Sequence, residues 1–372
     1  MTFLSRRVLP LLALALALAC SNAEPLGPSD SAVPSRSANG ARSFTVMSRN
    51  IYIGANVDAV IFALISPDPD DDLPALLGNV AVLQQTAFPV RAQALAAEIA
   101  RAHPHVVGLQ EVTELRVNLT GLGIPVDISL DFLPILLDAL AARGLSYTVA
   151  AQVTNLTAAP FPGISVTDHD VLLVDASRVT VGPGVVAQTY AVNVGVVAPG
   201  VDLERGWVRI DASVEGIPVT VASTHLESGS FPGFDALRAV QAAELVGSLA
   251  AASPAVVLGD LNDVPGSPMY GVVTGAGFSD AWADLRPGAS GFTCCHFADL
   301  SDQVARFNQR IDYVFARGFG GPQGKLQGRI TLIGDQPGER VSGPSHPIWA
   351  SDHAGVVMEF LLLPAVALAG AH

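Results

Sequence analysis

Short strand-like runs in this chain end, at five places, in an Asp, Glu, Asn or His side chain. These places are Glu111, His225, Asp260 with Asn262, Asp312, and Asp352 with His353. The run before Asp260, Ala255-Val256-Val257-Leu258, is typical of a strand buried in a sheet. Side chains two apart on a strand share a face, so Asp260 and Asn262 point into one place. The pattern predicts a rim of polar groups over an apolar sheet, and we expect the chemistry at that rim.

Helical and strand-like segments alternate along the chain. Leu95 and Ile99 keep helical spacing within 91–102, and Pro104 stops this helix before the strand that ends at Glu111. Further helices are predicted over 131–143 and 233–251, and strands over 44–50, 147–153, 310–316 and 353–360. Two more strands, 207–214 and 218–225, flank a hairpin signal at 215–217. Helices interleaved with hairpins favour a mixed α/β layered fold over a purely parallel, doubly wound sheet.

One domain is predicted over residues 43–363, because no internal repeat and no second boundary interrupts them. With 372 residues, half of them apolar, the chain can bury a sizeable core. Residues 318–350 are rich in Gly and Pro and are expected to form a long loop, as are residues 68–79, which begin with a solvated acidic run. Residues 364–372 are expected to form a tail.

The N-terminus resembles a secretion signal. Arg6 and Arg7 precede an apolar stretch, 8–19, that is too short to span a bilayer as an ordinary helix. We therefore expect residues 1–19 to be a signal peptide and the protein to be exported. Cys20, directly after the apolar stretch, resembles the lipid-acylated Cys of bacterial lipoproteins, so a membrane-anchored and a freely secreted form both stay open. Residues 20–42 are rich in Ser, Pro, Ala and Asn and are expected to form a flexible tether.

The balance of charge is strongly acidic. The formal net charge is −14, and Lys325 is the single lysine. A protein that holds a nucleic acid by its phosphates normally carries a basic stripe, and none is visible. A cluster of carboxylates around a divalent cation would account for part of the negative charge.

Two adjacent cysteines, Cys294 and Cys295, remain beyond Cys20. In an exported protein they could form a vicinal disulfide or stay as two buried thiols, and the sequence leaves both alternatives open. A zinc site is not expected, since Cys294-Cys295-His296 lacks the spacing that structural zinc ligands use.

Each rim residue has an ordinary structural interpretation when it is taken singly. An Asp caps a helix, an Asn makes an Asx turn, and a lone His is more often hydrogen-bonded structure than catalyst. Together the residues fit one task, the metal-assisted attack of water on a phosphate ester. Glu111 and Asp352 supply hard oxygen donors with Asn50 as a neutral third, which suits Mg²⁺ or Mn²⁺.

The other rim residues fit the remaining parts of that reaction. His353 is the predicted general base, and Asp312 orients its imidazole. Asp260 and Asn262 are predicted to hold the nucleophile and the phosphorus centre. His225 is predicted to donate to a phosphate oxygen whose charge grows in the transition state.

Six motifs in one order resemble the endonuclease/exonuclease/phosphatase family, which includes deoxyribonuclease-like nucleases, bacterial sphingomyelinases and inositol phosphatases. The motifs are Asn50 at the end of the first strand, Leu109-Gln110-Glu111-Val112, Ser223-Thr224-His225-Leu226, Gly259-Asp260-Leu261-Asn262, Arg310-Ile311-Asp312-Tyr313 and Ser351-Asp352-His353. The resemblance covers about residues 44–360. It implies a four-layer α/β/β/α sandwich of two packed mixed sheets with outer helices, in agreement with the alternation of elements.

The resemblance also implies roles for single residues. Glu111 would hold the metal, with Asn50 and Asp352 close by, and His353 would act as base with Asp312. Asp260 and Asn262 would position the nucleophile, and His225 would bind phosphate. The metal implied is Mg²⁺, with Mn²⁺ or Ca²⁺ as alternatives, and the partner is a phosphate-ester substrate, a lipid head group or a nucleic acid. No obligate protein partner is implied.

Two segments depart from the family pattern. Asp168-His169-Asp170 stands where many relatives have a Gly-rich approach to the strand, so Asp170 and its neighbours either shape a substrate pocket or form a solvated turn. Glu227 stands where sphingomyelinases tend to have Gln.

The leading hypothesis is an exported, metal-dependent phosphodiesterase. The acidic surface and the membrane tether at Cys20 favour a lipid head-group substrate over DNA. The alternatives are a secreted nuclease, a phosphomonoesterase, and, from a different class, a surface-anchored binding protein without activity.

Overall fold

A computed structural model describes residues 42–320 and 325–362, all of which fall in one compact unit. The predicted signal peptide, Cys20, the tail and all of the tether except Arg42 lie outside the described residues. Arg42 already begins the first strand, β1. Within the described residues, no helix combines the length and the apolar character needed to cross a membrane.

Two large mixed sheets make up the centre of the fold. The nine-stranded sheet has the order β15 (Gly328–Ile333), β18 (Gly355–Leu362), β1 (Arg42–Asn50), β2 (Val106–Asn118), β5 (Ile164–Asp175), β4 (Tyr147–Ala158), β9 (Val201–Leu203) and β8 (Gly195–Ala198), with β3 (Asp127–Asp131) paired to β2. The seven-stranded sheet has the order β13 (Ser279–Asp280), β14 (Asp312–Arg317), β12 (Ala255–Asp260), β11 (Ile217–His225), β10 (Gly206–Val214) and β6 (Val179–Val181), with β7 (Val186–Thr189) paired to β10. Strands β1 and β2 are parallel, as are β11 and β12, and the other pairs are antiparallel. A small third sheet joins β16 (Val341–Ser342) and β17 (Pro347–Ile348).

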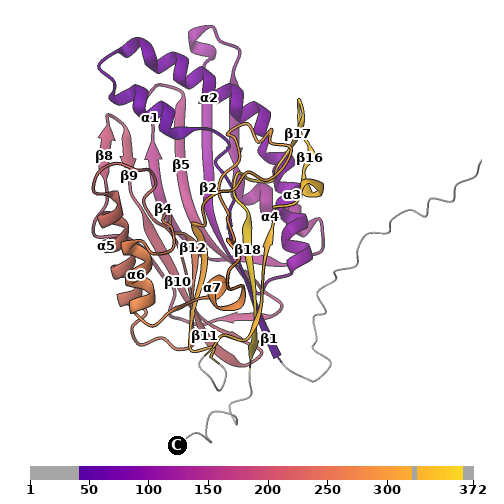
Figure 1. The fold of residues 1–372 in the computed structure, drawn as a ribbon. Coiled ribbons are helices and arrows are strands. Elements are labelled where there is room, and N and C mark those ends of the chain that lie inside the picture. The colour runs from indigo at the N-terminus through magenta and orange to yellow at the C-terminus, as the bar shows by residue number, and fades with distance from the viewer. Residues whose placement is uncertain (1–41, 321–324, 363–372) are drawn as a thin grey trace, which may run out of the picture. The chain divides into compact units, whose positions relative to one another are not determined.

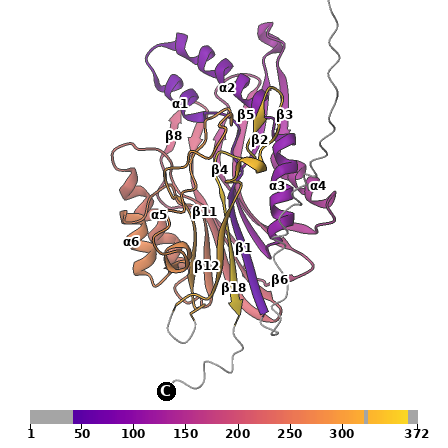
Figure 2. The same ribbon diagram turned by 45° about the vertical axis from the view of Figure 1, so that its right-hand side comes forward.

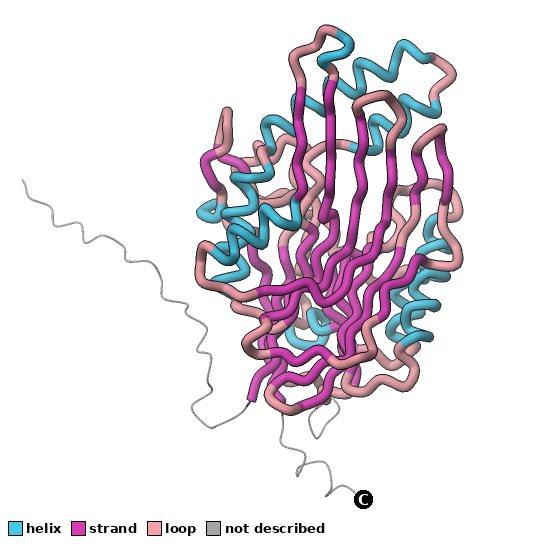
Figure 3. The backbone as a smooth tube through the Cα atoms, turned by 180° about the vertical axis from the view of Figure 1, so that it is seen from behind, coloured by secondary structure: helices cyan, strands magenta, loops and turns pink. Residues whose placement is uncertain are grey.

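Helices cover the outer face of each sheet. Figure 1 shows α3 (Phe88–Ala102) and α4 (Phe132–Ala141) on one side and α5 (Phe234–Ser248) and α6 (Pro268–Gly275) on the other, and the turned view of Figure 2 keeps this arrangement. Figure 3 shows the strands of both sheets between these helices. This is the four-layer α/β/β/α sandwich that the sequence predicts.

The central strands read as continuous apolar runs because both of their faces are buried. In β12, Val256 and Leu258 pack between the two sheets, while Ala255 and Val257 pack against α5 and α6. Alternate side chains of a strand point to opposite faces, so one apolar segment supplies two layers of core.

Two segments that the sequence analysis expects as loops carry regular structure instead. Residues 318–350 contain β15, which pairs with β18 at the edge of the larger sheet. This strand is short and only partly buried, so its pattern is weak. Residues 68–79 contain a single 3₁₀ turn (Pro69–Asp71) and the first half of α2 (Asp72–Thr86), which follows α1 (Val57–Ile65). The acidic run therefore stands at a helix N-terminus, where negative charge is favourable.

Candidate active site

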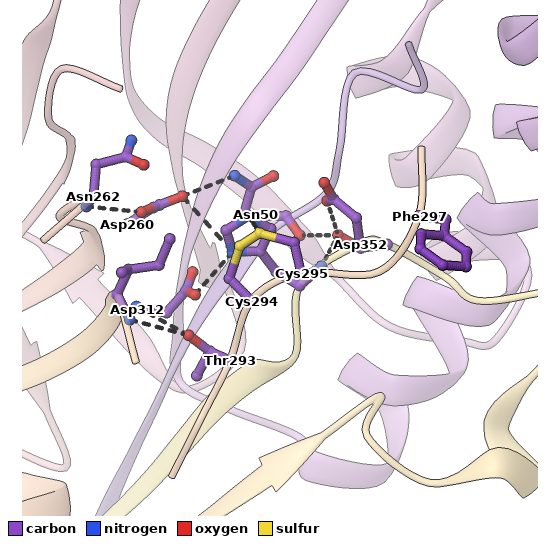
Figure 4. Close-up of a disulfide and its surroundings, with 12 residues drawn as sticks. Asn50, Asp260, Asn262, Thr293, Cys294, Cys295, Phe297, Asp312 and Asp352 are labelled. Atoms are coloured by element: carbon purple, nitrogen blue, oxygen red, sulfur yellow. Dashed lines mark hydrogen bonds and ion pairs between the residues drawn. A yellow bond between two sulfur atoms is a disulfide. The ribbon is translucent and has the colours of Figure 1, made fainter. Parts of the chain in front are cut away.

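One cavity of about 410 Å³ lies at the ends of β2, β11 and β12. Six of the eight predicted catalytic and metal-binding residues line it: Glu111, His225, Asp260, Asn262, Asp352 and His353. The other two, Asn50 and Asp312, are fully buried and hydrogen-bonded to lining residues. Figure 4 shows Asn50, Asp260 and Asp312 gathered close together. Residues from β1, β2, β11, β12, β14 and the segment before β18 thus meet in one place.

The end of β1 is tied to the end of β2 through Asn50 and Glu111. Asn50 Nδ2 donates to Glu111 Oε1 at 2.9 Å and to Asp260 Oδ2 at 3.1 Å, so one amide joins two carboxylates. Glu111 has a left-handed backbone, with φ 59°, and lies where the register of β2 with β5 shifts between Leu109 and Val112. A bulge of this kind re-aims a side chain. Glu111 Oε2 also accepts from the backbone of Ile53 at 2.7 Å.

Asp260 ends β12 at the centre of the cluster. Its Oδ1 accepts from the backbone N–H of Asn262 at 3.0 Å, and Asn262 Nδ2 donates to the carbonyl of Leu226 at 3.0 Å. Asp260 Oδ2 lies 3.7 Å from His225 Nε2 and 3.7 Å from His353 Nδ1. Asp260 therefore faces both imidazoles, and Asn262 is held against the end of β11.

His353 and Asp312 form a buried pair. His353 Nδ1 donates to Asp312 Oδ2 at 2.9 Å, and the backbone N–H of Asp312 donates to Thr293 Oγ1 at 3.2 Å. Because Nδ1 carries the proton toward Asp312, His353 Nε2 is the nitrogen free to accept one. Burial disfavours the imidazolium, but Asp312, Asp352 and Asp260 outweigh it and raise the pKa of His353 well above its usual value.

His225 has the opposite electrostatic environment. Burial, the Arg205 guanidinium and His353 hold the pKa of His225 well below its usual value, so the ring is neutral. Arg205 Nη1 lies 3.2 Å from His225 Nδ1. A guanidinium donates and never accepts, so Nδ1 is the acceptor and Nε2 carries the hydrogen. His225 thus presents an N–H donor on the side of Asp260.

The carboxylates are crowded together with little positive charge among them. Burial, and next to it the charge of Asp312, raises the pKa of Asp260 to about 7. Burial also raises the pKa of Asp352 to about 6, with Glu111 adding to the shift against the opposing effect of His353. Such a cluster binds a cation because the cation relieves the mutual repulsion of the carboxylates.

The oxygen donors fit a hard divalent cation. Glu111 and Asp352 line the same cavity, with Asn50 bonded to Glu111, and Asp312 Oδ1 is buried without a hydrogen-bond partner. Within residues 42–320 and 325–362, two trios of ionisable side chains have ligand atoms within 4.8 Å of one another: Asp260, Asp312 and His353, and Cys294, Cys295 and His353. Glu111 and Asp352 belong to neither trio, so their role as metal ligands stays a prediction.

Asp168, His169 and Asp170 do not form a solvated turn. They lie within β5, where Asp168 and Asp170 are buried on the same face. Asp168 lines the catalytic cavity and accepts from Thr113 Oγ1 at 2.9 Å, whereas Asp170 lies deeper and does not line the cavity. The pocket prediction is therefore wrong for Asp170. Asp168, two residues earlier in β5, is the residue of this pair at the cavity surface.

Three arginines were given no role by the sequence analysis. Arg205 lines the cavity and donates to Glu227 Oε1 at 3.4 Å, which neutralises the acidic residue that departs from the family pattern. Arg91 donates to the carbonyls of Ile51, Tyr52 and Ala350, and Arg49 donates to the carbonyl of His353. Arg91 and Arg49 are buried and hold the backbone on both sides of the site. An isolated arginine, with no partner nearby in sequence, does not indicate which distant groups it will contact.

Cys294 and Cys295 form a disulfide beside the site. Both line the catalytic cavity, and Cys295 Sγ lies 3.8 Å from His353 Nε2. The cysteines therefore belong to the wall of the cavity.

Comparison with known proteins agrees with this geometry. A sequence model of the endonuclease/exonuclease/phosphatase family matches residues 79–353. The structure is similar to an endonuclease/exonuclease/phosphatase from Beutenbergia cavernae, with TM-score 0.55 and 22% identity over 87% of this chain and 72% of that one. It is also similar to a family protein from Bacteroides thetaiotaomicron, with TM-score 0.57 and 16% identity over 89% and 99% of the two chains. Identities this low show a shared fold alone. No curated protein matches the chain in sequence.

The family match spans most of the chain, including the segments that carry Glu111, Asp260 and His353. Enzymes of this family hydrolyse phosphoric esters and depend on a divalent metal. The chain therefore belongs to the endonuclease/exonuclease/phosphatase family and is a metal-dependent phosphoric ester hydrolase.

Proposed function

We propose that the chain is an exported phosphodiesterase in which His353 acts as the general base. The observation that carries this proposal is the 2.9 Å bond between His353 Nδ1 and Asp312 Oδ2 in a cavity that also holds Glu111, Asp260 and Asp352. The bond leaves His353 Nε2 to take a proton from water as the water oxygen forms its bond to phosphorus. The P–O bond to the leaving group breaks, the leaving oxygen takes up a proton from solvent to depart as the alcohol, and His353 returns its proton to solvent.

The remaining side chains orient and stabilise the reacting groups. Asp260 and Asn262 hold the attacking water, and His225 Nε2–H donates to a phosphate oxygen as its charge grows. Glu111, Asn50 and Asp352 would hold the divalent cation, Mg²⁺ or else Mn²⁺ or Ca²⁺. When bound, that cation neutralises phosphate charge and stabilises the leaving oxygen.

We further propose that the substrate is a lipid head-group phosphodiester. The net charge of −14 and the absence of a basic stripe in the sequence favour it over a nucleic acid. Export through residues 1–19, with acylation at Cys20, would place the enzyme at a membrane. Mass spectrometry of the mature N-terminus tests this: an acylated Cys20 supports the anchored form, and an unmodified N-terminus supports secretion.

Activity is tested with bis(p-nitrophenyl) phosphate in the presence of Mg²⁺ or Mn²⁺. Replacement of Glu111 or His353 by Ala should lower turnover by at least about 100-fold, since each removes a group that acts in the transition state. Circular dichroism and thermal unfolding check that these variants fold. Turnover that persists in both variants, or that EDTA leaves unchanged, would end the proposal.

Substrate class is tested by three assays under the same metal. Release of phosphocholine from sphingomyelin vesicles is the expected activity. Nicking of plasmid DNA would indicate a nuclease, and release of inorganic phosphate from a sugar phosphate would indicate a phosphomonoesterase. Tight binding of a phosphodiester without turnover would indicate a surface-anchored binding protein without activity.

A further inference from the structure

A second cavity, of about 100 Å³, lies beneath α1 and α2, and its wall is almost wholly apolar. Figure 1 shows these two helices together over the far ends of β2, β4 and β5. Most of its lining residues come from α1, α2 and these strands, among them Leu64, Leu76, Val80, Leu115 and Leu156. Asn79 is the one polar residue among those that line it.

This apolar cavity adjoins the catalytic cavity. Ile53, Ala55, Val57, Ile61 and Leu156 line both of them. Ile53 is also the residue whose backbone N–H donates to Glu111 Oε2 at 2.7 Å. The apolar wall therefore includes a residue that is hydrogen-bonded to Glu111, a carboxylate of the site.

An exposed apolar rim lies on α1 and on the segment before α5. Phe62 of α1 is 50% exposed and its ring lies 5.6 Å from that of Phe231, which is 49% exposed. Ser228 and Gly229, on the segment that leads to Phe231, line the catalytic cavity. Ile65 extends the rim along α1 at 50% exposure. Large apolar side chains exposed beside a binding cavity mark a surface that contacts an apolar partner.

The volume limits what the cavity can hold. An engineered apolar cavity of about 150 Å³ stays dry and takes one benzene, so 100 Å³ takes only a few carbon atoms. A longer hydrocarbon would fill the cavity and continue out over Phe62 and Phe231. A sugar phosphate offers no group that would gain from such a wall, and the polar edges of a nucleobase would be left without hydrogen-bond partners inside the cavity.

We propose that the cavity under α1 and α2, together with the rim of Phe62, Ile65 and Phe231, is a subsite for the hydrocarbon part of a phosphodiester substrate. The inference rests on the proposed function and defines its substrate as an ester that carries an alkyl or acyl group close to phosphorus. Binding of the hydrocarbon would hold the phosphate against Glu111 and His353.

A series of alkyl phosphocholines tests the proposal on the wild-type protein, with release of phosphocholine as the readout. The ethyl, butyl and octyl esters share one head group and one charge and differ only in the alkyl alcohol that leaves, which is the side that carries the hydrocarbon in sphingomyelin. We expect kcat/KM to rise by up to roughly fourfold for each of the first few methylenes, the factor that corresponds to burial of one CH₂. The rise should come mainly from a lower KM.

A cavity-filling variant tests the place of binding. Leu64→Trp puts a larger side chain into the cavity from α1, away from the catalytic residues, and should lower the octyl-to-ethyl ratio of kcat/KM at least tenfold. The matched control is Val240→Trp on α5, where Val240 is 48% exposed, and it should leave the ratio unchanged.

The two possible failures are distinguishable. Equal kcat/KM for all three esters in the wild-type protein would overturn the hydrocarbon subsite and leave the phosphodiesterase intact. A ratio that Leu64→Trp leaves unchanged, in a variant that folds, would also overturn it. No hydrolysis of any ester with Mg²⁺, Mn²⁺ or Ca²⁺ would instead overturn the proposed function.

Discussion

The chemistry of the site depends on which nitrogen of each imidazole carries a proton. Asp312 fixes the proton of His353 on Nδ1, and Arg205 fixes that of His225 on Nε2. One histidine therefore offers an acceptor and the other a donor toward the same space. The pKa values of the two rings move in opposite directions, that of His353 upward and that of His225 downward, and it is the deprotonated form of His353 that offers the acceptor.

Replacement of Asp312 by Asn tests this arrangement. The amide keeps the shape but cannot stabilise an imidazolium, so kcat for bis(p-nitrophenyl) phosphate should fall by roughly 100-fold or more. Asp312 raises the pKa of His353, so its loss should move the acidic limb of the pH–rate profile to lower pH. Asp284→Asn, at an exposed position on α7 (Ala281–Leu285), is the control. A wild-type kcat in Asp312→Asn would contradict the assignment.

Another buried histidine, His105, affects stability rather than activity. His105 Nδ1 accepts from the backbone N–H of Thr45 at 3.0 Å, and burial, with help from Arg178, lowers its pKa from 6.5 to about 4. Between these two pH values the unfolded chain binds a proton that the folded chain does not. Stability should therefore rise with pH over this window, by on the order of 2–3 kcal/mol from this residue.

Urea unfolding at several pH values between 4 and 7 measures this contribution. His105→Gln keeps an acceptor for Thr45 without a titrating ring, so the difference in unfolding free energy between wild type and variant should shrink as pH falls. A difference that stays constant with pH would show that His105 titrates normally in the folded protein.

At the scale of elements, the strand ends were the part of the site that the sequence predicted well. Buried strands have a strong apolar signal, and the ends of β2, β11 and β12 are brought together by the sheets themselves, so Glu111, His225 and Asp260 could be grouped in advance. The role of Arg205 could not be predicted, because it depends on contacts with β11 and the segment after it.

The helices α1 and α2 could not be predicted from the sequence for a different reason. The segment 57–86 holds an acidic run, three prolines and Gly78, which are typical of a loop, and part of its apolar face lines a cavity. Tertiary contacts with β2 and β4 decide the structure of this segment. The helices α1 and α2, which cover the apolar cavity, were therefore the part of the fold that was hardest to predict from the sequence.

The junction of α2 and α3 stores backbone strain at Ala87. This residue has φ 37° and ψ 73°, and its backbone N–H caps α2 by donating to the carbonyl of Leu83. A left-handed residue at a helix end favours Gly, since Ala costs roughly 1–2 kcal/mol there. Ala87→Gly should therefore be neutral or stabilise the protein by up to about 1 kcal/mol. Ala97→Gly, at an exposed position inside α3, should instead destabilise it by about 1 kcal/mol. Equal losses in the two variants, measured by urea unfolding, would contradict the assignment of strain.

At the scale of the whole described domain, the two sheets approach closely next to the active site. A Cβ at Gly108 of β2 would lie 2.6 Å from Ser223 Oγ and 3.1 Å from Leu258 Cβ in the opposite sheet. Gln110 Nε2 donates to the same Ser223 Oγ at 3.1 Å. The spacing of the sheets therefore sets the position of Glu111, the next residue after Gln110, against Asp260.

Gly108→Ala tests this coupling of packing and catalysis. The added methyl group must push the sheets apart, so stability should fall by about 1–3 kcal/mol and kcat should fall with it, because a shift near 1 Å at a reacting group costs about 100-fold. Ser223→Ala removes the nearest clashing atom, so the double variant should recover part of both losses. The control is Gly78→Ala in α2, where an added Cβ meets no atom within 4 Å, and it should stabilise the protein slightly. If Gly108→Ala lost stability but kept full kcat, Glu111 would be positioned by β2 and its own hydrogen bonds alone, independently of the contact between the sheets.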